Sequence, residues 1–330
     1  MSSFMDGTLS LGHSGTTVTF LGCGTLGTSI LSGIMASLSE PRSSSAYPPL
    51  SGSATPSEGL PLHQIPSRFI ACVRRAESVK RIQHILSPYH LPLTILQNEN
   101  VKGVTDSDVV ILGCKPYMLN DVLNVPGMRD ALKGKLLISI LAGVPAEQIE
   151  EVLYKDSDVD MADRCRVVRA MPNTAAIVRE SMTVIASTNP PLSHIQNTMV
   201  AWIFTRVGRV ITLPPHIMDA STALAGSGTA FVALVLEALA DGAVAMGLPR
   251  AESQLMAAQV MRGTAGMVLN GEHPALIREK TSTPGGCTIG GLLVLEEGRV
   301  RGTIARSVRE ATVVASQLGK GVQGVNGTRF

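Results

Sequence analysis

The sequence predicts an α/β protein in which a doubly wound sheet domain is followed by an all-α domain. Residues 18–34 combine a short apolar run, a glycine-rich turn and apolar residues at helical spacing. Short apolar segments that end in turn residues then recur up to residue 213. From His216 onward the chain is rich in alanine and leucine and has no convincing strand. We expect a loose tail over residues 1–16, a sheet domain over 17–213 and a helical domain over 214–330.

Three glycines in GxGxxG spacing form the turn after the first strand. Gly22 would allow the turn, Gly24 would let backbone N–H groups approach a pyrophosphate, and Gly27 would let the helix pack closely on the strand. The N-terminus of the helix offers unpaired donors and a partial positive charge to an anion. The pattern favours a Rossmann-type dinucleotide-binding domain. The alternative is a purely structural turn, because 32 of the 330 residues are glycine.

Composition argues against several other classes of protein. Lys and Arg total 28 against 26 Asp and Glu, and only six Phe and one Trp are present, so nucleic acid is an unexpected partner. The five cysteines form no CxxC pair, which predicts neither a metal site nor a disulfide framework. No Lys or Arg precedes Arg42, whereas a secretory or mitochondrial leader would contain basic residues near its start. We expect a cytoplasmic protein without a metal.

The second predicted strand, residues 68–73, follows a Ser-, Pro- and Gly-rich stretch over residues 39–66 that we interpret as an inserted surface loop. The strand ends in Arg74 and Arg75, where a dinucleotide fold meets the adenosine ribose. Arginine at this point accommodates a 2′-phosphate, which favours NADPH, with NADH as the alternative. The competing interpretation is a pair of solvated surface arginines. Glu77 lies too far into the next helix to be a convincing acidic partner of the ribose.

Further strands are predicted over residues 93–96, 109–112, 136–141, 167–171, 183–186 and 210–213, with a helix over 191–207 before the last. The carboxyl ends of parallel strands open onto the cofactor crevice. Turn residues follow three of these strand ends. They are Gly113, Lys115 and Pro116 after residues 109–112, Ala142 and Gly143 after 136–141, and Pro172, Asn173 and Thr174 after 167–171. For Lys115 we keep two interpretations open, which are contact with a cofactor or substrate and an ordinary solvent-exposed lysine.

The helical domain begins with residues 220–236, a stretch of 17 residues without a charge. Such a helix is usually buried, and in a small domain this indicates burial against a partner subunit. Gly226, Ser227 and Gly228 interrupt the stretch, and the charges of Glu237 and Asp241 close it, so membrane insertion is not expected. A second helix is predicted over residues 250–269.

A second glycine-rich segment, TSTPGGCTIGGLL over residues 281–293, leads into another apolar helix. Hydroxyls and backbone N–H groups at a helix N-terminus are suited to a small carboxylate. An ordinary capping turn is the alternative.

These motifs together resemble the pyrroline-5-carboxylate reductase family. The matching segments are GCGTLG at 22–27, GCKP at 113–116, LAGVP at 141–145, RAMPNTAAIVRES at 169–181, LAGSGTAF at 224–231, ADGAVAMGLPR at 240–250 and TSTPGGCTIGGLLVLEEG at 281–298. The resemblance implies a nucleotide-binding domain followed by a helical dimerisation domain, with active sites at the subunit interface and dimers gathered into larger rings. Thr229 and Phe231 depart from the proline and tyrosine that the family usually has there.

The resemblance also implies a division of the site residues and a reaction. The cofactor would contact Gly22, Gly24, Thr25, Leu26, Arg74, Arg75, Asn98, Lys115, Pro116, Ala142 and Gly143. The substrate, a small cyclic imino acid, would contact Asn173, Ser282, Thr283, Gly286, Cys287 and Thr288. Since the site lacks His, Asp and Glu, we expect the Thr288 hydroxyl to bond the ring nitrogen during hydride transfer. The alternatives are reduction of a homologous ring, such as a piperideine carboxylate, and a noncatalytic nucleotide-binding scaffold.

Overall fold

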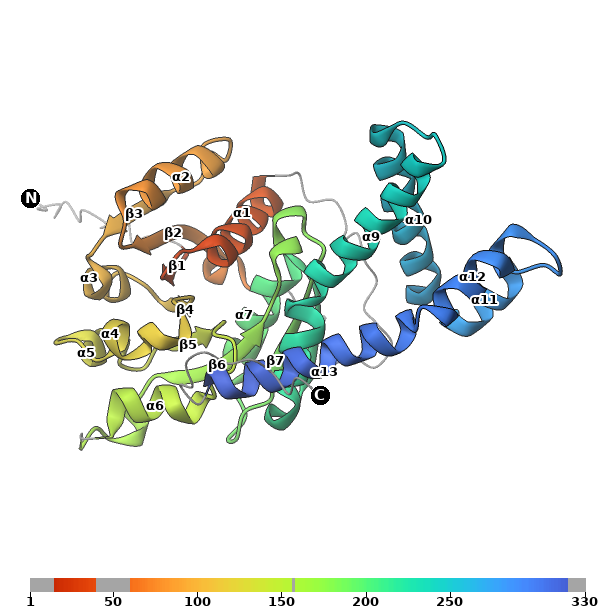
Figure 1. Cartoon of the computed structure of the whole chain (residues 1–330). Coiled ribbons are helices and arrows are strands. Elements are labelled where there is room, and N and C mark those ends of the chain that lie inside the picture. The colour runs from red at the N-terminus through yellow and green to blue at the C-terminus, as the bar shows by residue number, and fades with distance from the viewer. Residues whose placement is uncertain (1–14, 40–59, 156–157, 320–330) are drawn as a thin grey trace, which may run out of the picture. The chain divides into compact units, whose positions relative to one another are not determined.

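The computed structural model describes residues 15–39, 60–155 and 158–319 (Figure 1). The chain divides into two compact units, one ending at Met218, which also takes in Gly319, and one beginning at Asp219. We call them the sheet unit and the helical unit. The predicted tail lies outside the described residues except for Gly15 and Thr16, as does most of the predicted inserted loop.

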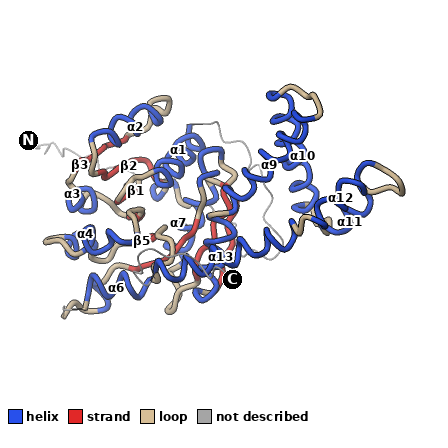
Figure 2. Tube along the Cα trace, viewed as in Figure 1, coloured by secondary structure: helices blue, strands red, loops and turns tan. Residues whose placement is uncertain are grey.

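In its described residues the sheet unit is built on eight strands in the order β3-β2-β1-β4-β5-β6-β7-β8. Figure 2 draws the strands in red. The strands β1 to β6 are parallel, whereas β7 is antiparallel to β6 and parallel to β8. The order reverses at β1, which pairs with β2 on one side and β4 on the other. The bounds are β1 Thr16–Leu21, β2 Pro66–Val73, β3 Leu93–Gln97, β4 Val109–Leu112, β5 Leu136–Ser139, β6 Arg166–Met171, β7 Ser181–Ala186 and β8 Gly208–Leu213.

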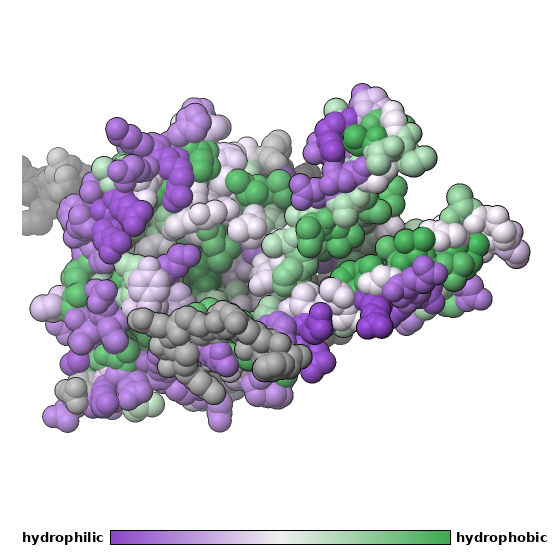
Figure 3. Space-filling view, viewed as in Figure 1, coloured by the Kyte–Doolittle hydropathy of each residue, from purple (hydrophilic) through white to green (hydrophobic). Residues whose placement is uncertain are grey.

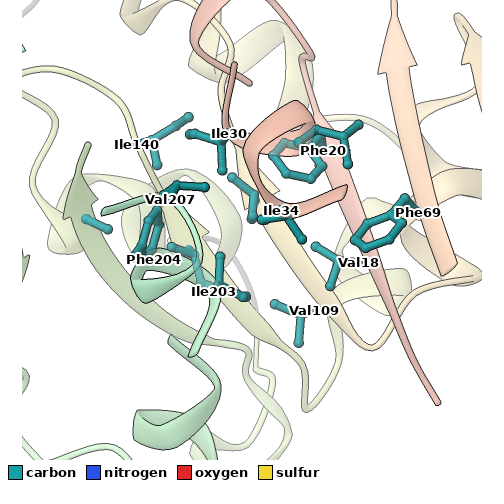
Figure 4. Close-up of a cluster of buried hydrophobic side chains, with 14 of the residues drawn as sticks. Val18, Phe20, Ile30, Ile34, Phe69, Val109, Ile140, Ile203, Phe204 and Val207 are labelled. Atoms are coloured by element: carbon teal, nitrogen blue, oxygen red, sulfur yellow. The ribbon is translucent and has the colours of Figure 1, made fainter. Parts of the chain in front are cut away.

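Helices cover both faces of this sheet, as a doubly wound fold requires. One buried cluster joins alternate strand residues, such as Phe20 and Val109, to α1, α2 and α7 (Figure 4). The other joins their neighbours along the strands, such as Leu21 and Val110, to α3, α4, α5 and α6. The helices are α1 Thr25–Ser39, α2 Ala76–Leu86, α3 Asn100–Thr105, α4 Leu119–Leu123, α5 Met128–Leu132, α6 Ala146–Tyr154 and α7 His194–Thr205. The alternation of two side-chain directions along each strand therefore produces two cores.

Several predicted boundaries shift for identifiable reasons. β2 begins at Pro66 rather than residue 68, and Leu60, inside the predicted loop, is buried in the α1 face of the core. β5 ends at Ser139 because the chain then turns, reaching a positive φ of 73° at Gly143. α7 begins only after Ser193, whose side chain accepts a bond from Gln196 N in a capping box.

The helical unit has five long or medium helices after a short irregular start. Its elements are α8 Met218–Ser221, a π-helical turn Thr222–Gly226, α9 Gly228–Ala245, α10 Arg250–Leu269, α11 Pro274–Thr281, α12 Cys287–Glu297 and α13 Val300–Gly319. The prediction for residues 250–269 is confirmed by α10. The helix α9 continues through Glu237 and Asp241 to Ala245, because charged residues on an exposed helix face do not stop a helix.

Candidate functional site

The candidate site starts where the strand order reverses. Gly22 follows β1 with φ of 89°, and a Cβ there would lie 2.8 Å from Cys114 N. Gly113 N donates to Leu21 O at 2.9 Å, so the chain after β4 is held against the end of β1. A side chain at position 22 would be strained and would also collide with this backbone. The structure therefore gives a steric reason for the first glycine of the motif.

The next part of the turn is open. Gly24 is exposed, and a Cβ placed there would meet nothing within 4 Å. α1 begins at Thr25, and its first bond to the loop is from Thr28 N to Gly24 O at 2.9 Å. The N–H groups of Thr25 and Leu26 lie in the first turn and have no intrahelical acceptor. This geometry suits a pyrophosphate at the N-terminus of α1.

The structure contradicts the packing role predicted for the third glycine, Gly27. A Cβ at Gly27 would lie 3.6 Å from both Phe20 and Cys23, which is ordinary van der Waals contact. The close approach of α1 occurs instead at Gly33, where a Cβ would lie 2.4 Å from Ala176 O. The position on α1 that requires glycine is therefore Gly33, because α1 there packs against the 3₁₀ turn Thr174–Val178 and not against the strand.

At the ends of β2 and β3 the structure separates the two predicted arginines. Arg75 is the residue before α2 and lines a surface hollow of about 300 Å³, together with Glu77, Ser78 and Arg81. Arg74 does not line the hollow, and its carbonyl accepts a bond from Gln97 Nε2 at 3.3 Å. Asn98 adopts φ of 58° and donates its N–H to Val73 O at 3.0 Å. Sequence reasoning missed Ser78 and Arg81, although their spacing of three residues indicates one helix face.

The residues after β4 and β5 complete the crevice edge. Lys115 is exposed, and Pro116 opens a short 3₁₀ turn, Pro116–Met118, in which Tyr117 is 79% exposed. Ala142 is half-buried and Gly143 is buried. Ile140 N donates to Leu112 O at 3.0 Å, so the β5 end follows the β4 end directly. The carboxyl ends of β1, β4 and β5 thus meet at one edge, as the sequence predicted.

Two thiols near this edge are not nucleophiles. Burial raises the pKa of Cys23 to about 11, with a hydrogen bond to Thr28 and the Arg81 charge acting against it. Burial likewise raises the pKa of Cys114 to about 11. Both are therefore neutral near pH 7, whereas cysteine nucleophiles need a lowered pKa. In the described part of the chain no three His, Cys, Asp or Glu side chains are grouped to hold a metal.

Asn173 lies in the sheet unit, apart in sequence from the other predicted substrate residues. It is buried, precedes the turn Thr174–Val178, and its Oδ1 accepts from Ala175 N at 3.0 Å. Its own N–H donates to Ser181 Oγ at 3.0 Å. These bonds fix the residue at the carboxyl end of β6.

In the helical unit, the predicted substrate residues form a tight turn between α11 and α12. Thr281 Oγ1 donates to Ile277 O at 2.6 Å, and Ser282 Oγ donates to Arg278 O at 2.8 Å. Each hydroxyl has one hydrogen, so neither can also donate to a carboxylate in this arrangement. Gly286 N donates to Thr283 O at 3.0 Å, and a Cβ at Gly286 would lie 2.5 Å from Thr283 Oγ1.

The turn ends at the N-terminus of α12. Gly285 has φ of 69°, which favours glycine, and Gly286 is the residue before the helix. Cys287 is the first helical residue and is exposed, while Thr288 is the second and is half-buried. The first-turn N–H groups have no intrahelical acceptors and therefore can receive an anion.

One helical stretch, Pro215–Ala245, is long and apolar enough to cross a membrane by length and composition. Only 11% of its most apolar window is buried within the chain. The stretch is interrupted by the π-helical turn and includes Glu237 and Asp241. An apolar helix of this kind is also typical of a subunit interface.

Comparison with known proteins gives the family context. Residues 215–318 match the family described as pyrroline-5-carboxylate reductase dimerisation, and residues 53–143 match NADP oxidoreductase coenzyme F420-dependent. The pyrroline-5-carboxylate reductase of Lophium arboricola is 61% identical over 319 residues, covering 95% of this chain and 97% of that protein. That of Neurospora crassa is 53% identical over 329 residues, covering 95% and 96%.

A solved structure agrees on the fold. The crystal structure of Plasmodium falciparum pyrroline carboxylate reductase with NADP bound matches with a TM-score of 0.73 at 23% identity. The match covers 93% of this chain and 100% of that one.

The fold and the family matches define a two-domain protein with a Rossmann-like N-terminal domain and a C-terminal helical dimerisation domain. The predicted fold class is thereby confirmed. Identity to relatives over nearly their whole length narrows the assignment. The chain belongs to the pyrroline-5-carboxylate reductase family, as the motifs predicted.

Proposed function

We propose that this chain is an NADPH-dependent oxidoreductase that reduces 1-pyrroline-5-carboxylate to L-proline, the last step of proline biosynthesis. The observation that carries the proposal is the sequence identity of 61% and 53% to two relatives called pyrroline-5-carboxylate reductase, over nearly their whole length. The two glycine-rich sites support it, because one suits a dinucleotide and the other a small carboxylate. The test is loss of NADPH absorbance with the purified chain and the imine, followed by detection of proline.

The cofactor residues divide into three groups by what each would hold. Gly22, Gly24, Thr25 and Leu26 would receive the pyrophosphate, and Arg74, Arg75 and Asn98 would surround the adenosine ribose. The third group would line the nicotinamide side of the crevice, and it comprises Lys115, Pro116, Ala142 and Gly143. NADPH supplies the hydride when it is bound, and the chain supplies its position.

The turn before α12 would hold the substrate through its backbone. Since Thr281 and Ser282 donate their hydroxyl hydrogens to α11, the donors for a carboxylate are the N–H groups at the start of α12. Thr283, Gly286 and Cys287 would shape this pocket, and Ser282 would position it. Asn173, at the end of β6, would contact the same substrate.

Thr288 would be the catalytic side chain. A cyclic imine loses positive charge as it accepts hydride, so a neutral hydroxyl on the ring nitrogen fits the transition state better than a carboxylate does. Thr288 is half-buried at the start of α12, beside the N–H groups that would bind the substrate carboxylate. Removal of one hydrogen-bond donor to a transition state typically costs roughly 100- to 1,000-fold in rate.

The test compares Thr288→Ala with Thr288→Ser. We expect Thr288→Ala to lower kcat and Thr288→Ser to retain most of it, because serine keeps the hydroxyl. Thr105→Ala is the control, since the Thr105 hydroxyl only bonds Val101 O within α3. Wild-type kcat in Thr288→Ala would contradict the assigned role.

A homologous imine is the second candidate substrate. Thr229, which replaces the family's usual proline, lies in the first turn of α9, and its hydroxyl donates to Gly226 O at 3.3 Å. Phe231 replaces tyrosine in the same turn. These changes motivate a comparison of kcat/KM for pyrroline-5-carboxylate and piperideine carboxylate. A larger value for the six-membered ring would reassign the substrate, and no NADPH oxidation with either would favour a noncatalytic scaffold.

We also propose that the helical unit forms a homodimer, that dimers assemble further into a ring, and that the enzyme is cytoplasmic. The dimerisation match over residues 215–318 supports the dimer, and five free cysteines fit a reducing compartment. Light scattering after gel filtration measures the mass of the assembly. Cell fractionation determines the compartment, and recovery with an organelle fraction would contradict the cytoplasmic location.

A further inference from the structure

A buried serine, Ser181, lies directly beside the proposed substrate residue Asn173. Ser181 is the first residue of β7, and only 2% of it is exposed. Its Oγ accepts a hydrogen bond from the N–H of Asn173, eight residues earlier in the chain, at 3.0 Å. The bond is buried, so water does not compete for it. A buried hydroxyl is therefore joined to the part of the sheet unit that is proposed to meet the substrate.

The Ser181 hydroxyl extends the strand pairing past the point where the backbone pairing ends. β6 and β7 pair at Ala170↔Ile185 and Met171↔Val184. Asn173 follows the last of these pairs, and its N–H donates to the Ser181 side chain instead of to a strand carbonyl. A buried backbone N–H requires an acceptor, because leaving it unpaired costs free energy. The hydroxyl at position 181 thus supplies what the sheet no longer provides.

The main chain of Ser181 is held by the neighbouring strand. Ser181 N donates to Val207 O at 2.9 Å, and Ser181 is paired with Gly208 at the start of β8. A Cβ at Gly208 would lie 2.5 Å from Ser181 N and would also overlap Ser181 O. Glycine at position 208 therefore allows β8 to lie directly against the Ser181 backbone. The starting point of the Ser181 side chain is fixed as a result.

The turn that begins at Asn173 is held at two further points. Asn173 Oδ1 accepts from Ala175 N at 3.0 Å, which fixes the side chain on the first part of the turn. The middle of the turn packs against α1, since a Cβ at Gly33 would collide with Ala176 O. The bond to Ser181 joins the beginning of this turn to β7. Together these contacts give Asn173 one position at the carboxyl end of β6.

We propose that Ser181 is a positioning residue for the substrate, because its hydroxyl holds Asn173 where Asn173 contacts the cyclic imino acid. The inference rests on the proposed function, in which Asn173 binds the substrate. Ser181 is too deeply buried to contact the substrate itself and acts through Asn173. Loss of the hydroxyl should loosen the start of the turn and weaken binding of the imine. The glycine turn after β1, which would bind the cofactor, should be unaffected.

Amide hydrogen exchange in the full-length chain tests the bond without turnover. In Ser181→Ala the N–H of Asn173 loses its acceptor, so this amide should exchange about 5- to 100-fold faster than in the wild type. Mass spectrometry of peptides that span Asn173 measures the rate. Unchanged exchange in Ser181→Ala would overturn the proposal.

Thr183→Val is the matched control. Thr183 is fully buried two residues along the same strand, so its side chain points to the same face. Its hydroxyl has no hydrogen-bond partner among the described residues, so its removal should leave the Asn173 amide within about twofold of the wild-type rate. Equal acceleration in the two variants would overturn the proposal. A circular dichroism melt confirms that each variant folds.

Steady-state kinetics tests the role of Ser181 in the proposed reaction. We expect Ser181→Ala to raise KM for pyrroline-5-carboxylate by about 5- to 20-fold, with kcat and KM for NADPH within about twofold of the wild type. A contact made equally in the ground state and the transition state changes KM in this way. An equal rise in KM for NADPH, or the same rise for the imine in Thr183→Val, would show a general loss of structure and would contradict the role.

A double-mutant cycle shows whether Ser181 acts through Asn173. In an Asn173→Ala background, Ser181→Ala should raise KM for the imine by less than about twofold, because the side chain that it positions is already absent. Independent, multiplicative effects of the two changes would overturn the proposal.

Failure of the proposed function would be seen separately. If the wild-type chain does not oxidise NADPH with the imine, the proposed reaction is wrong, while the exchange rates still decide whether Ser181 holds the turn. If the chain is active and Asn173→Ala has the wild-type KM for the imine, Asn173 is not a substrate residue and the positioning role fails with it.

Discussion

The sheet unit and the helical unit bury their apolar residues in different ways. In the sheet unit, two clusters of buried side chains lie on the two faces of one sheet. In the helical unit, the buried residues between Asp219 and Leu318 are Thr222, Ala223, Ala240, Ser253, Ala257, Ile277 and Ala315. Most of these are small. Figure 3 shows apolar residues on the surface of α9 and of the α11–α12 pair.

The difference indicates what each unit needs in order to fold. Leu234 on α9 and Leu255 on α10 are 67% and 70% exposed, and Leu293 and Val294 on α12 are also exposed. Covering one such side chain contributes about 1.5–3 kcal/mol. The helical unit thus leaves large apolar side chains exposed, in agreement with its match to a dimerisation family, whereas the sheet unit buries its apolar side chains within one chain.

The largest expected effect comes from charging the apolar surface of the helical unit. Leu234→Glu with Leu255→Glu should abolish the dimer, because each buried unpaired carboxylate costs several kcal/mol. Light scattering should give monomer or aggregate, and thermal unfolding should lose any transition that depends on protein concentration. Met161→Glu is the control, since Met161 is 72% exposed in the sheet unit. A dimer of unchanged stability in the double variant would contradict the proposed interface.

A smaller effect is expected inside the sheet unit, where packing is close. Gly33→Ala should lower the free energy of unfolding by about 1–3 kcal/mol, because the new Cβ would lie 2.4 Å from Ala176 O. Gly27→Ala should leave it unchanged or slightly raised, since the space accepts a methyl group. Urea unfolding midpoints measure both. Equal effects of the two changes would mean that α1 is not held at Gly33.

Buried thiols give the sheet unit a dependence on alkaline pH. Burial is the main cause that raises the pKa of Cys72 to about 12 and of Cys165 to about 11, from an ordinary value of 9.0. The unfolded chain therefore loses these protons first, so their contribution is complete below pH 9 and falls as pH rises towards 11. The urea midpoint should be lower at pH 10 than at pH 8.

Two cysteine variants identify the source of that dependence. Cys72→Ala should reduce the difference between the two midpoints. Cys287→Ala should not, because Cys287 is exposed in the helical unit. A difference that stays the same in Cys72→Ala would show that other groups cause it.

The smallest effect is expected from surface charge in the helical unit. Arg250 and Asp241 form an ion pair of 2.5 Å that joins α10 to α9, and both side chains are at least half exposed. Solvent screens such pairs, so Arg250→Gln should change the free energy of unfolding by less than about 0.5–1 kcal/mol. Chemical denaturation at low and high salt measures it. A larger loss would mean that ionic contacts, rather than apolar burial, hold α9 to α10.

Sequence reasoning succeeded where local patterns repeat. The strands were found because short apolar runs are followed by turn residues, and α10 was located at both ends by Pro249 and Gly271. It was wrong about Gly27, because a Cβ there would lie 3.6 Å from Phe20 and Cys23, which is ordinary contact. The requirement for glycine at position 33 could not be recognised from the sequence, because it comes from contact with the Ala176 carbonyl, which is far along the chain.

The sequence by itself determined the fold class, the family and the two glycine-rich turns, because each depends on residues close together in the chain. Only the tertiary structure separated Arg75 from Arg74, placed Arg81 in the same hollow, and assigned the hydrogens of Thr281 and Ser282 to α11. These facts depend on which direction a side chain takes and on what lies opposite it. Packing fixes both, and neither is encoded in spacing along the chain.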